Sequence, residues 1–445
     1  MIDSGQMLTA VLMLGGVLGG VMIGYPLAIV VGFIGMVAGV GEFGIIPTLE
    51  LFYSRTYELL TNYTFLAIPM FVFMGSMLEH SGVARGLYDA LYEALGRLKG
   101  GLAIATVLIG TVLAAAVGIL GASVTMLTLV ALPSMIEKGY DKSLAAGSVM
   151  AGGTLGILIP PSVMLVVYGP LASLSVGKLL MGAFLPGFML SGLYCAYIAI
   201  VCYIKPSYGP AISHEQRLST VQILKKLLVS LLPPAVLIMS VLGVIFLGIA
   251  PPTQAASVGA FASILIALAY GKLTWENFKD AAMQTVKISG MVMLVGTMCF
   301  SFVGVFIRVG GGEVISQFLL NLPIGRWGVL GIVLLFTVFL GMVMEWIGVL
   351  FILVPIVTPI MAKFGFNPLW FALMMCITLQ TSFLTPPVAP AIFYFQGAVD
   401  PKLGVNIGHA MKGVLPFIFL VLVGVALCSL FPNIILWLPS IMIGG

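Results

Sequence analysis

Long runs of apolar residues, separated by short polar segments, follow one another along almost the whole chain. A helix needs about 20 mostly apolar residues to cross the hydrocarbon core of a bilayer, and most of these runs have that length. The pattern therefore predicts an all-α polytopic membrane protein. Membrane spans are expected at residues 7–24, 26–41, 62–80, 179–204, 228–249, 253–270, 288–308 and 413–431.

Two further apolar runs contain a Pro-Pro step that cannot remain helical. One reads GILIPPS at 156–162 and the other reads SFLTPPV at 382–388. Each proline removes a backbone donor and blocks the helix. At membrane depth such a break is tolerated only where the freed carbonyls face protein, water or an ion. We therefore expect broken helices at 143–170 and 367–396.

The two breaks belong to a longer internal repeat. When Pro160 is placed on Pro386, an offset of 226 residues, Gly139 falls on Gly365 without a gap. Matched breaks in two halves of a chain point to the substrate and ion site of a secondary transporter. In each half a re-entrant hairpin is expected before the break, at 101–137 and at 327–362.

The segment 205–226 is the one polar connection of any length. We interpret it as a cytoplasmic linker between two inverted repeats, 1–204 and 227–445. Short amphipathic stretches at 42–60 and 272–287 are expected to lie along the membrane interface.

Composition and charge placement agree with this layout. Hydrophobic residues make up 61% of the chain and charged residues 8%, whereas charged residues are roughly a quarter of a soluble domain. If the N-terminus is periplasmic, 14 of the 19 lysines and arginines fall in cytoplasmic loops, as the positive-inside rule requires. Both termini are then periplasmic, and the two hairpins enter the membrane from opposite sides. No basic stripe with aromatics indicates a nucleic-acid partner.

Polar residues gather at the hairpin tips, expected at 118–125 and 341–349, and at the breaks. A small cation needs several oxygen ligands, which unwound carbonyls supply without adding charge. Helix N-termini supply partial positive charge for an anionic substrate. The candidate substrate-binding residues are Ser123, Thr125, Ser162, Glu345 and Gln380.

Individual residues in this set also have simpler explanations. The hydroxyls of Ser123, Thr125, Thr154 and Ser162 can each bond the preceding helical turn. Glu345 can reach water at an exposed tip, although an acid within a long apolar segment is usually functional.

Four segments resemble a known family of transporters. They read GTLGILIPPS, FLTPPVAPAIFY, PLASLSVGKLLMGAFLPG and LAIPMFVFMGSMLEHSG. They are similar to the large membrane subunit of the tripartite ATP-independent periplasmic (TRAP) transporters, over nearly the whole chain. The resemblance implies an elevator-type transporter with sodium coupling and arm helices. It also implies a separate small four-helix membrane subunit (DctQ-type) and a periplasmic binding protein (DctP-type) that delivers an organic acid.

The resemblance further implies where the coupling sodium ions bind; no other cofactor is expected. The first tip, usually Gly-Ser-Ser in the family, reads Gly121-Ala122-Ser123 here, and the acidic position of the second tip, often Asp, is Glu345. Backbone ligation is compatible with both departures. The implied ion-site residues are Gly121, Ser123, Gly153, Thr154, Gly156 and Pro160 in the first half, and Gly341, Glu345, Thr381, Ser382, Thr385 and Pro386 in the second.

The sequence thus predicts sodium-coupled uptake of a small organic acid across a bacterial inner membrane, without enzymatic activity. The alternative is a proton- or sodium-coupled organic anion transporter that works without a binding protein. A channel would need a continuous polar pore, and an intramembrane enzyme would need a nucleophile–base pair or metal ligands at depth. The sequence shows neither. Sialic acids, dicarboxylates, 2-oxo acids and sulfonates all fit as substrates, and the number of sodium ions is open.

Overall fold

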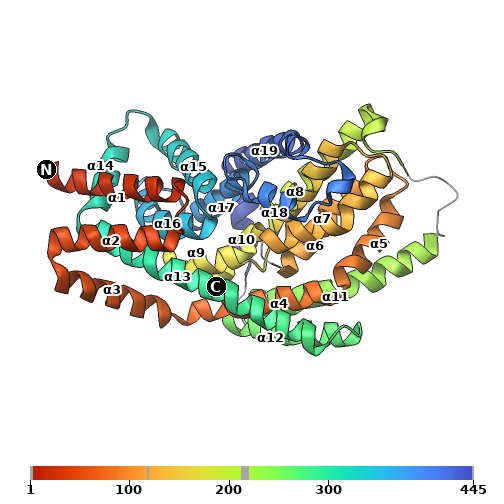
Figure 1. Cartoon of the computed structure of the whole chain (residues 1–445), viewed down its shortest axis with the longest axis horizontal. Coiled ribbons are helices and arrows are strands. Elements are labelled where there is room, and N and C mark those ends of the chain that lie inside the picture. The colour runs from red at the N-terminus through yellow and green to blue at the C-terminus, as the bar shows by residue number, and fades with distance from the viewer. Residues whose placement is uncertain (1–3, 118–119, 212–219, 443–445) are drawn as a thin grey trace.

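The computed structural model describes residues 4–117, 120–211 and 220–442, and every regular element in these residues is helical (Figure 1). The first half contains α1 (Ser4–Met22), α2 (Leu27–Phe43), α3 (Ile45–Leu60), η1 (Tyr63–Leu66), α4 (Ala67–His80), α5 (Val83–Leu95), α6 (Gly101–Val117), α7 (Leu120–Glu137), α8 (Lys142–Leu158), α9 (Val163–Leu171), α10 (Val176–Ile204) and η2 (Pro206–Tyr208). The second half contains α11 (Thr220–Phe246), α12 (Pro252–Ala269), α13 (Trp275–Arg308), α14 (Gly311–Leu320), α15 (Gly325–Val343), α16 (Trp346–Lys363), α17 (Pro368–Leu384), α18 (Pro390–Ala398), η4 (Pro401–Leu403), α19 (Ile407–Leu430) and α20 (Asn433–Ser440).

The described helices confirm the polytopic all-α prediction. Nine of them are long and apolar enough to cross a membrane, or up to eleven if each bent pair counts as one span. One bent pair, α3 with η1 and α4, turns by 53°, and the other, α8 with α9, turns by 41° at the first Pro-Pro step.

The offset of 226 residues reappears in the helix boundaries. Shifting both bounds of α7 and of α8 by 226 gives the bounds of α16 and of α17 at every end. The two helices after the Pro-Pro steps, α9 and α18, agree to within one residue. Each half therefore has the predicted order of hairpin, then broken helix.

Local signals explain why these boundaries repeat. Gly139 and Gly365 have φ angles of 77° and 78° after α7 and α16, a left-handed conformation in which glycine is favoured at helix ends. The side chains of Asp141 and Asn367 then each accept two backbone N–H groups at the start of α8 and α17. Such caps satisfy otherwise unpaired donors of the first turn. Both Pro-Pro peptide bonds are cis.

One prediction about the second half was wrong. The stretch 272–287 is not separate from the span 288–308, because α13 runs through both as one helix of 34 residues. No proline divides it, and the Thr274 side chain caps its start by accepting the Asn277 N–H at 3.1 Å. Within the predicted linker 205–226, the residues from Thr220 onward belong to α11, and residues 212–219 lie outside the described part of the chain.

Most of the amphipathic stretch 42–60 forms α3, which begins after a break at Gly44 and continues through a bend into α4. The helices α5, α14 and α20 were not anticipated; all three are shorter than a membrane span.

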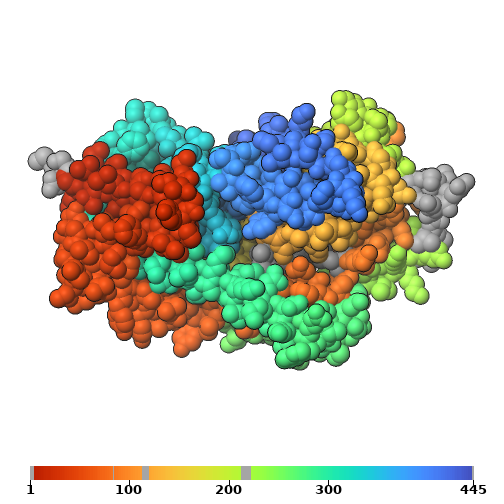
Figure 2. All heavy atoms as spheres, viewed as in Figure 1, coloured from red at the N-terminus to blue at the C-terminus, as the bar shows by residue number. Residues whose placement is uncertain are grey.

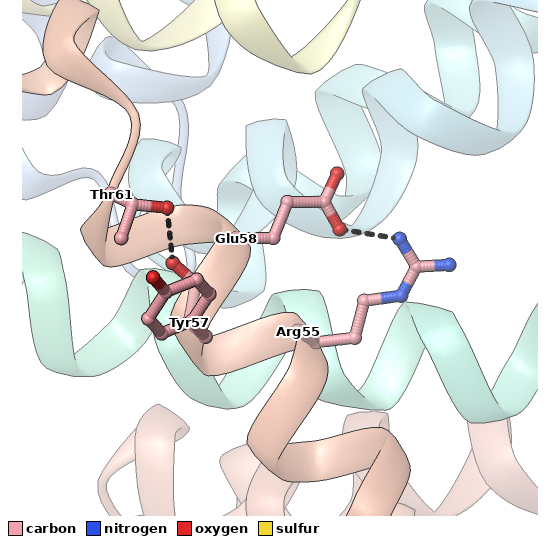
Figure 3. A network of polar contacts seen from close by, with 4 residues as sticks. All are labelled: Arg55, Tyr57, Glu58 and Thr61. Carbon is pink, nitrogen blue, oxygen red and sulfur yellow. Dashed lines mark hydrogen bonds and ion pairs between the residues drawn. The ribbon is translucent and has the colours of Figure 1, made fainter.

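The helices α3, α4, α12 and α13, called the arm helices or arms below, form a band along the lower part of Figure 1, below the hairpins and broken helices. In the space-filling view, α12 and α13 (green) occupy this edge beneath the C-terminal helices (blue) (Figure 2). Arg55 of α3 donates to Glu58 at 2.9 Å, and Thr61 donates to the Tyr57 carbonyl at 2.7 Å (Figure 3). The Arg55 guanidinium also lies 5.4 Å from the ring centre of Phe300 on α13, which links the two arms.

The broken helices lie at the centre of the protein. Residues 144–158 of α8 and 370–384 of α17 are all buried. Glycines allow this close packing: a Cβ added to Gly110 of α6 would lie 2.6 Å from the carbonyl carbon of Gly152. One added to Gly147 would lie equally close to the carbonyl carbon of Gly413 on α19. Small residues let membrane helices approach at backbone distance.

Candidate functional site

The second hairpin turns at Met344 and Glu345, within the predicted tip 341–349. Glu345 immediately precedes the first turn of α16, and its side chain is exposed.

The first hairpin has a shorter tip than the predicted 118–125. Residues 118–119 lie outside the described part of the chain, and α7 is helical from Leu120 onward. Ser123 and Thr125 therefore lie on the first turns of α7 and not in a loop, because Gly121 is accommodated in the helix and no proline interrupts it there.

The first break frees backbone oxygen atoms. Pro160 and Pro161 lack the N–H groups that would bond the carbonyls of Gly156 and Ile157 in a continuous helix. The Ser162 hydroxyl donates to the Ile157 carbonyl in place of one of them. This leaves the Gly156 carbonyl as the candidate ligand, whereas Ser162 has an intramolecular partner.

Hydroxyl groups beside both breaks bond the preceding turn, as the simpler explanation for serine and threonine requires. The bonds are Thr154 to Ala151 O at 2.9 Å, Thr381 to Thr378 O, Ser382 to Leu379 O at 2.7 Å, and Thr385 to Thr381 O at 2.6 Å. A hydroxyl that donates to a carbonyl keeps its own lone pairs, so these oxygen atoms can still bind a cation.

Each hairpin tip lies directly against the break of its own half. A Cβ added to Gly153 would lie 3.0 Å from Val124 Cα, beside Ser123. A Cβ added to Gly341 would lie 2.7 Å from Ser382 Cβ. The structure thus brings together the tip and break residues that the sequence predicted as ion ligands in each half.

Two predicted residues stand out because they are fully buried without a partner. Ser123 Oγ and both amide atoms of Gln380 have no hydrogen bond among the described residues. Buried polar groups nearly always have a partner, so an unpaired one marks a place for a ligand, ion or water.

A cavity of about 740 Å³ lies where the tips, the breaks and the arm helices meet. The predicted residues Gly121, Thr125 and Glu345 line it, whereas the buried Ser123 and Gln380 do not. Tyr394 of α18 also lines it and packs against the first tip: a Cβ on Gly121 would lie 2.9 Å from its ring.

Four helices begin at this cavity. The first residues of α7, α9, α16 and α18 all line it; they are Leu120, Val163, Trp346 and Pro390. A helix N-terminus carries about +0.5 of an elementary charge and unpaired N–H groups, which attract anions. The helix ends on the hairpins and broken helices therefore give this wall of the cavity a partial positive charge.

The opposite wall contains residues that the sequence reasoning missed. Glu79 of α4 and Gln284 of α13 line the cavity from the arm helices. The Ser76 hydroxyl donates to Gln284 Oε1 at 2.6 Å, which joins α4 to α13. Glu79, like Glu345, is an acid within an apolar run. The rule that such acids are usually functional could therefore have identified it from the sequence.

Comparison with known proteins agrees with this architecture. Residues 9–434 match the family described as "Tripartite ATP-independent periplasmic transporter, DctM component". The chain belongs to the DctM family. It is 31% identical to the C4-dicarboxylate TRAP transporter large permease protein DctM of Pseudomonas aeruginosa, over 87% of this chain and 88% of that protein.

Other relatives of this DctM chain have different names. It is 28% identical to the sialic acid TRAP transporter large permease protein SiaM of Vibrio cholerae, over 86% of this chain and 88% of that one. It is 30% identical to the isethionate TRAP transporter permease protein DctMQ of Oleidesulfovibrio alaskensis, over 93% of this chain but 64% of that longer protein.

The crystal structure of the YdaH transporter of Alcanivorax borkumensis has a similar fold, with a TM-score of 0.62 and 14% sequence identity. The match covers 86% of the DctM chain and 89% of YdaH. At this identity the likeness concerns the fold alone. The family match places this multi-pass membrane protein among the large permeases of TRAP transporters for organic acids.

Proposed function

We propose that this DctM chain carries a small organic acid inward, coupled to sodium entry, by an elevator motion of its hairpins and broken helices against the arms. The observation that carries the proposal is the meeting of four helix N-termini at one cavity. Four partial positive charges and free N–H groups suit a carboxylate or sulfonate better than a neutral solute.

Sodium coupling is supported by the oxygen atoms around the breaks. The Gly156 carbonyl lacks its helical donor, and the hydroxyls of Thr381, Ser382 and Thr385 retain lone pairs. Hard cations take oxygen ligands of this kind. One cation site in each half, beside Ser123 and beside Glu345, gives at least two sodium ions.

An elevator motion is supported by the division of the cavity wall. One side belongs to the hairpins and broken helices and the other to α4 and α13. If the first group moves as a unit along the arms, the cavity faces alternate sides of the membrane. The inverted repeats, with boundaries at 204 and 227, would make the two end states equivalent in packing.

The partners and location follow from the family. Its description names a tripartite periplasmic transporter, which supports a small DctQ-type membrane subunit and a DctP-type periplasmic binding protein. We place the complex in the bacterial inner membrane with both termini periplasmic.

The direct test is uptake into proteoliposomes that contain the chain and its small subunit. Radiolabelled dicarboxylates, sialic acids, 2-oxo acids and sulfonates are screened with binding protein outside, with and without an inward sodium gradient. We expect uptake of one class that requires both sodium and the binding protein. Vesicles without the chain, and vesicles with equal sodium on both sides, are the controls.

Two outcomes would contradict the proposal. Uptake driven by a proton gradient alone would remove sodium coupling. Uptake indifferent to the binding protein would favour the second mechanism, an organic anion transporter that works without one.

A further inference from the structure

The charge on the cavity wall is divided between its two sides. Its lining includes two acids, Glu79 and Glu345, and no lysine, arginine or histidine among the described residues that line it. The helix N-termini, all on the side of the hairpins and broken helices, therefore supply the positive potential there. Glu345 lies on that side, at the second hairpin tip where we propose a cation site. Glu79 lies across the cavity, on the arms.

The Glu79 carboxyl forms no ion pair among the described residues, although the base His80 follows it in the chain and acts on it electrostatically. Its Oε2 atom is buried and has no hydrogen-bond partner among the described residues. Nearby, Gln284 already accepts from Ser76 through Oε1, so its amide Nε2 is the donor that remains. The arm wall thus offers an acidic oxygen and one amide donor, whereas the facing wall offers helix N-termini.

We infer that the cavity selects organic acids with a single carboxylate or sulfonate group that also carry hydroxyl or ammonium groups, and that Glu79 determines this specificity. The acid group of such a substrate lies against the helix N-termini, and its hydroxyl or ammonium group donates to Glu79. A dicarboxylate of the same length would place its second carboxylate against Glu79, where like charges repel in a partly dehydrated site. This inference rests on the proposed function because it assigns the cargo of the same cavity.

The charge of the arm wall can be measured without knowing the substrate. Met291 of α13 lines the same wall and is 39% exposed. In a variant without the five native cysteines, Met291→Cys is modified with cationic trimethylammonioethyl or anionic sulfonatoethyl methanethiosulfonate. The reference is Thr253→Cys in a second cavity of about 600 Å³, which has no charged residue among its described lining.

We expect the ratio of cationic to anionic modification rates to be about tenfold higher at Met291→Cys than at the reference, and Glu79→Gln to abolish the difference. The neutralised charge acts with opposite sign on the two reagents, which doubles its effect on the logarithm of the ratio. Glu50→Gln, at an exposed acid of α3, is the matched control and should change nothing. Equal ratios at both positions, as a protonated Glu79 would give, overturn the inference. So does a lack of reaction with both reagents at Met291→Cys and also at Thr125→Cys on the facing wall.

Specificity is then tested with three four-carbon acids as inhibitors of the sodium-driven uptake described above. Succinate, 4-hydroxybutyrate and 4-aminobutyrate differ only in the group at one end. We expect the last two to inhibit at concentrations at least tenfold below succinate, and Glu79→Gln to lower the succinate concentration required. Equal inhibition by all three, including none, would overturn the inference, as would a preference for succinate. If no acid is taken up at all, the proposed function fails, while the cysteine experiment still decides the charge of the wall.

Discussion

Gln380 is the sharpest test of the site because its side chain is fully buried and both of its amide atoms lack partners. Leaving a buried polar group unsatisfied costs about 1–3 kcal/mol. Replacing Gln380 with methionine, which has nearly the same shape, removes two such groups. The ligand-free protein should therefore gain about 2 kcal/mol or more in its free energy of unfolding.

The gain can be expressed as a change in melting temperature. An unfolding entropy of roughly 2.1 cal/mol/K per residue, over 445 residues, gives about 0.9 kcal/mol/K. Gln380→Met should then raise Tm by about 2 °C in detergent without sodium or organic acid, measured by tryptophan fluorescence at one fixed scan rate. If Gln380 contacts the ligand, sodium together with the transported acid should stabilise the wild type by more than the variant.

A matched control variant should change Tm in the opposite direction. Gln284→Met removes the acceptor of the buried Ser76 hydroxyl, so Tm should fall by about 1 °C. The reasoning is refuted if Gln380→Met lowers Tm of the ligand-free protein, or if ligands stabilise variant and wild type equally. Either result would mean that the Gln380 amide serves the fold and not the ligand.

The remaining predictions concern the contact between tips and breaks. Gly153→Ala places a methyl group 3.0 Å from Val124 Cα. It should lower Tm by roughly 1–3 °C and weaken sodium-dependent uptake. The control Gly192→Ala, whose methyl group has no atom within 4 Å, should leave Tm and uptake unchanged. Equal behaviour of the two variants would show that the tip does not need this close approach. Ser123→Ala should raise the sodium concentration for half-maximal uptake by about tenfold, corresponding to one lost ligand hydroxyl, and Thr385→Val should do the same. Unchanged sodium dependence in both variants would exclude these hydroxyls as ion ligands.

Much of the fold could be predicted from the sequence because its decisive signals are local. The Pro160-Pro161 and Pro386-Pro387 steps end their helices, although α11 continues through a third step, Pro233-Pro234. Gly139 with Asp141 ends one helix and starts the next without help from distant residues. These signals recur at an offset of 226, so the hairpins and broken helices could be placed in both halves. The candidate residues at the second tip and at both breaks followed from the same pattern.

Other features could not be predicted because the local sequence pattern contains no information about distant contacts. Apolarity alone did not show that α13 continues from an amphipathic start into a span, nor that α3 bends into α4. The sequence also could not show which hydroxyl groups have hydrogen-bond partners. Ser123 and Thr154 are equivalent candidates in the sequence, yet only Thr154 has a partner in the described structure.

The sequence by itself thus determined the membrane class, the two breaks and the repeat, since each depends on the chemistry of a few neighbouring residues. Only the tertiary structure decided which residues face one another across the cavity. Glu79 and Gln284 come from arms more than 200 positions apart, and helices that are apolar on most faces carry little information about their neighbours. Their pairing is decided by close packing at glycines and by a few buried polar contacts, such as the one between Ser76 and Gln284.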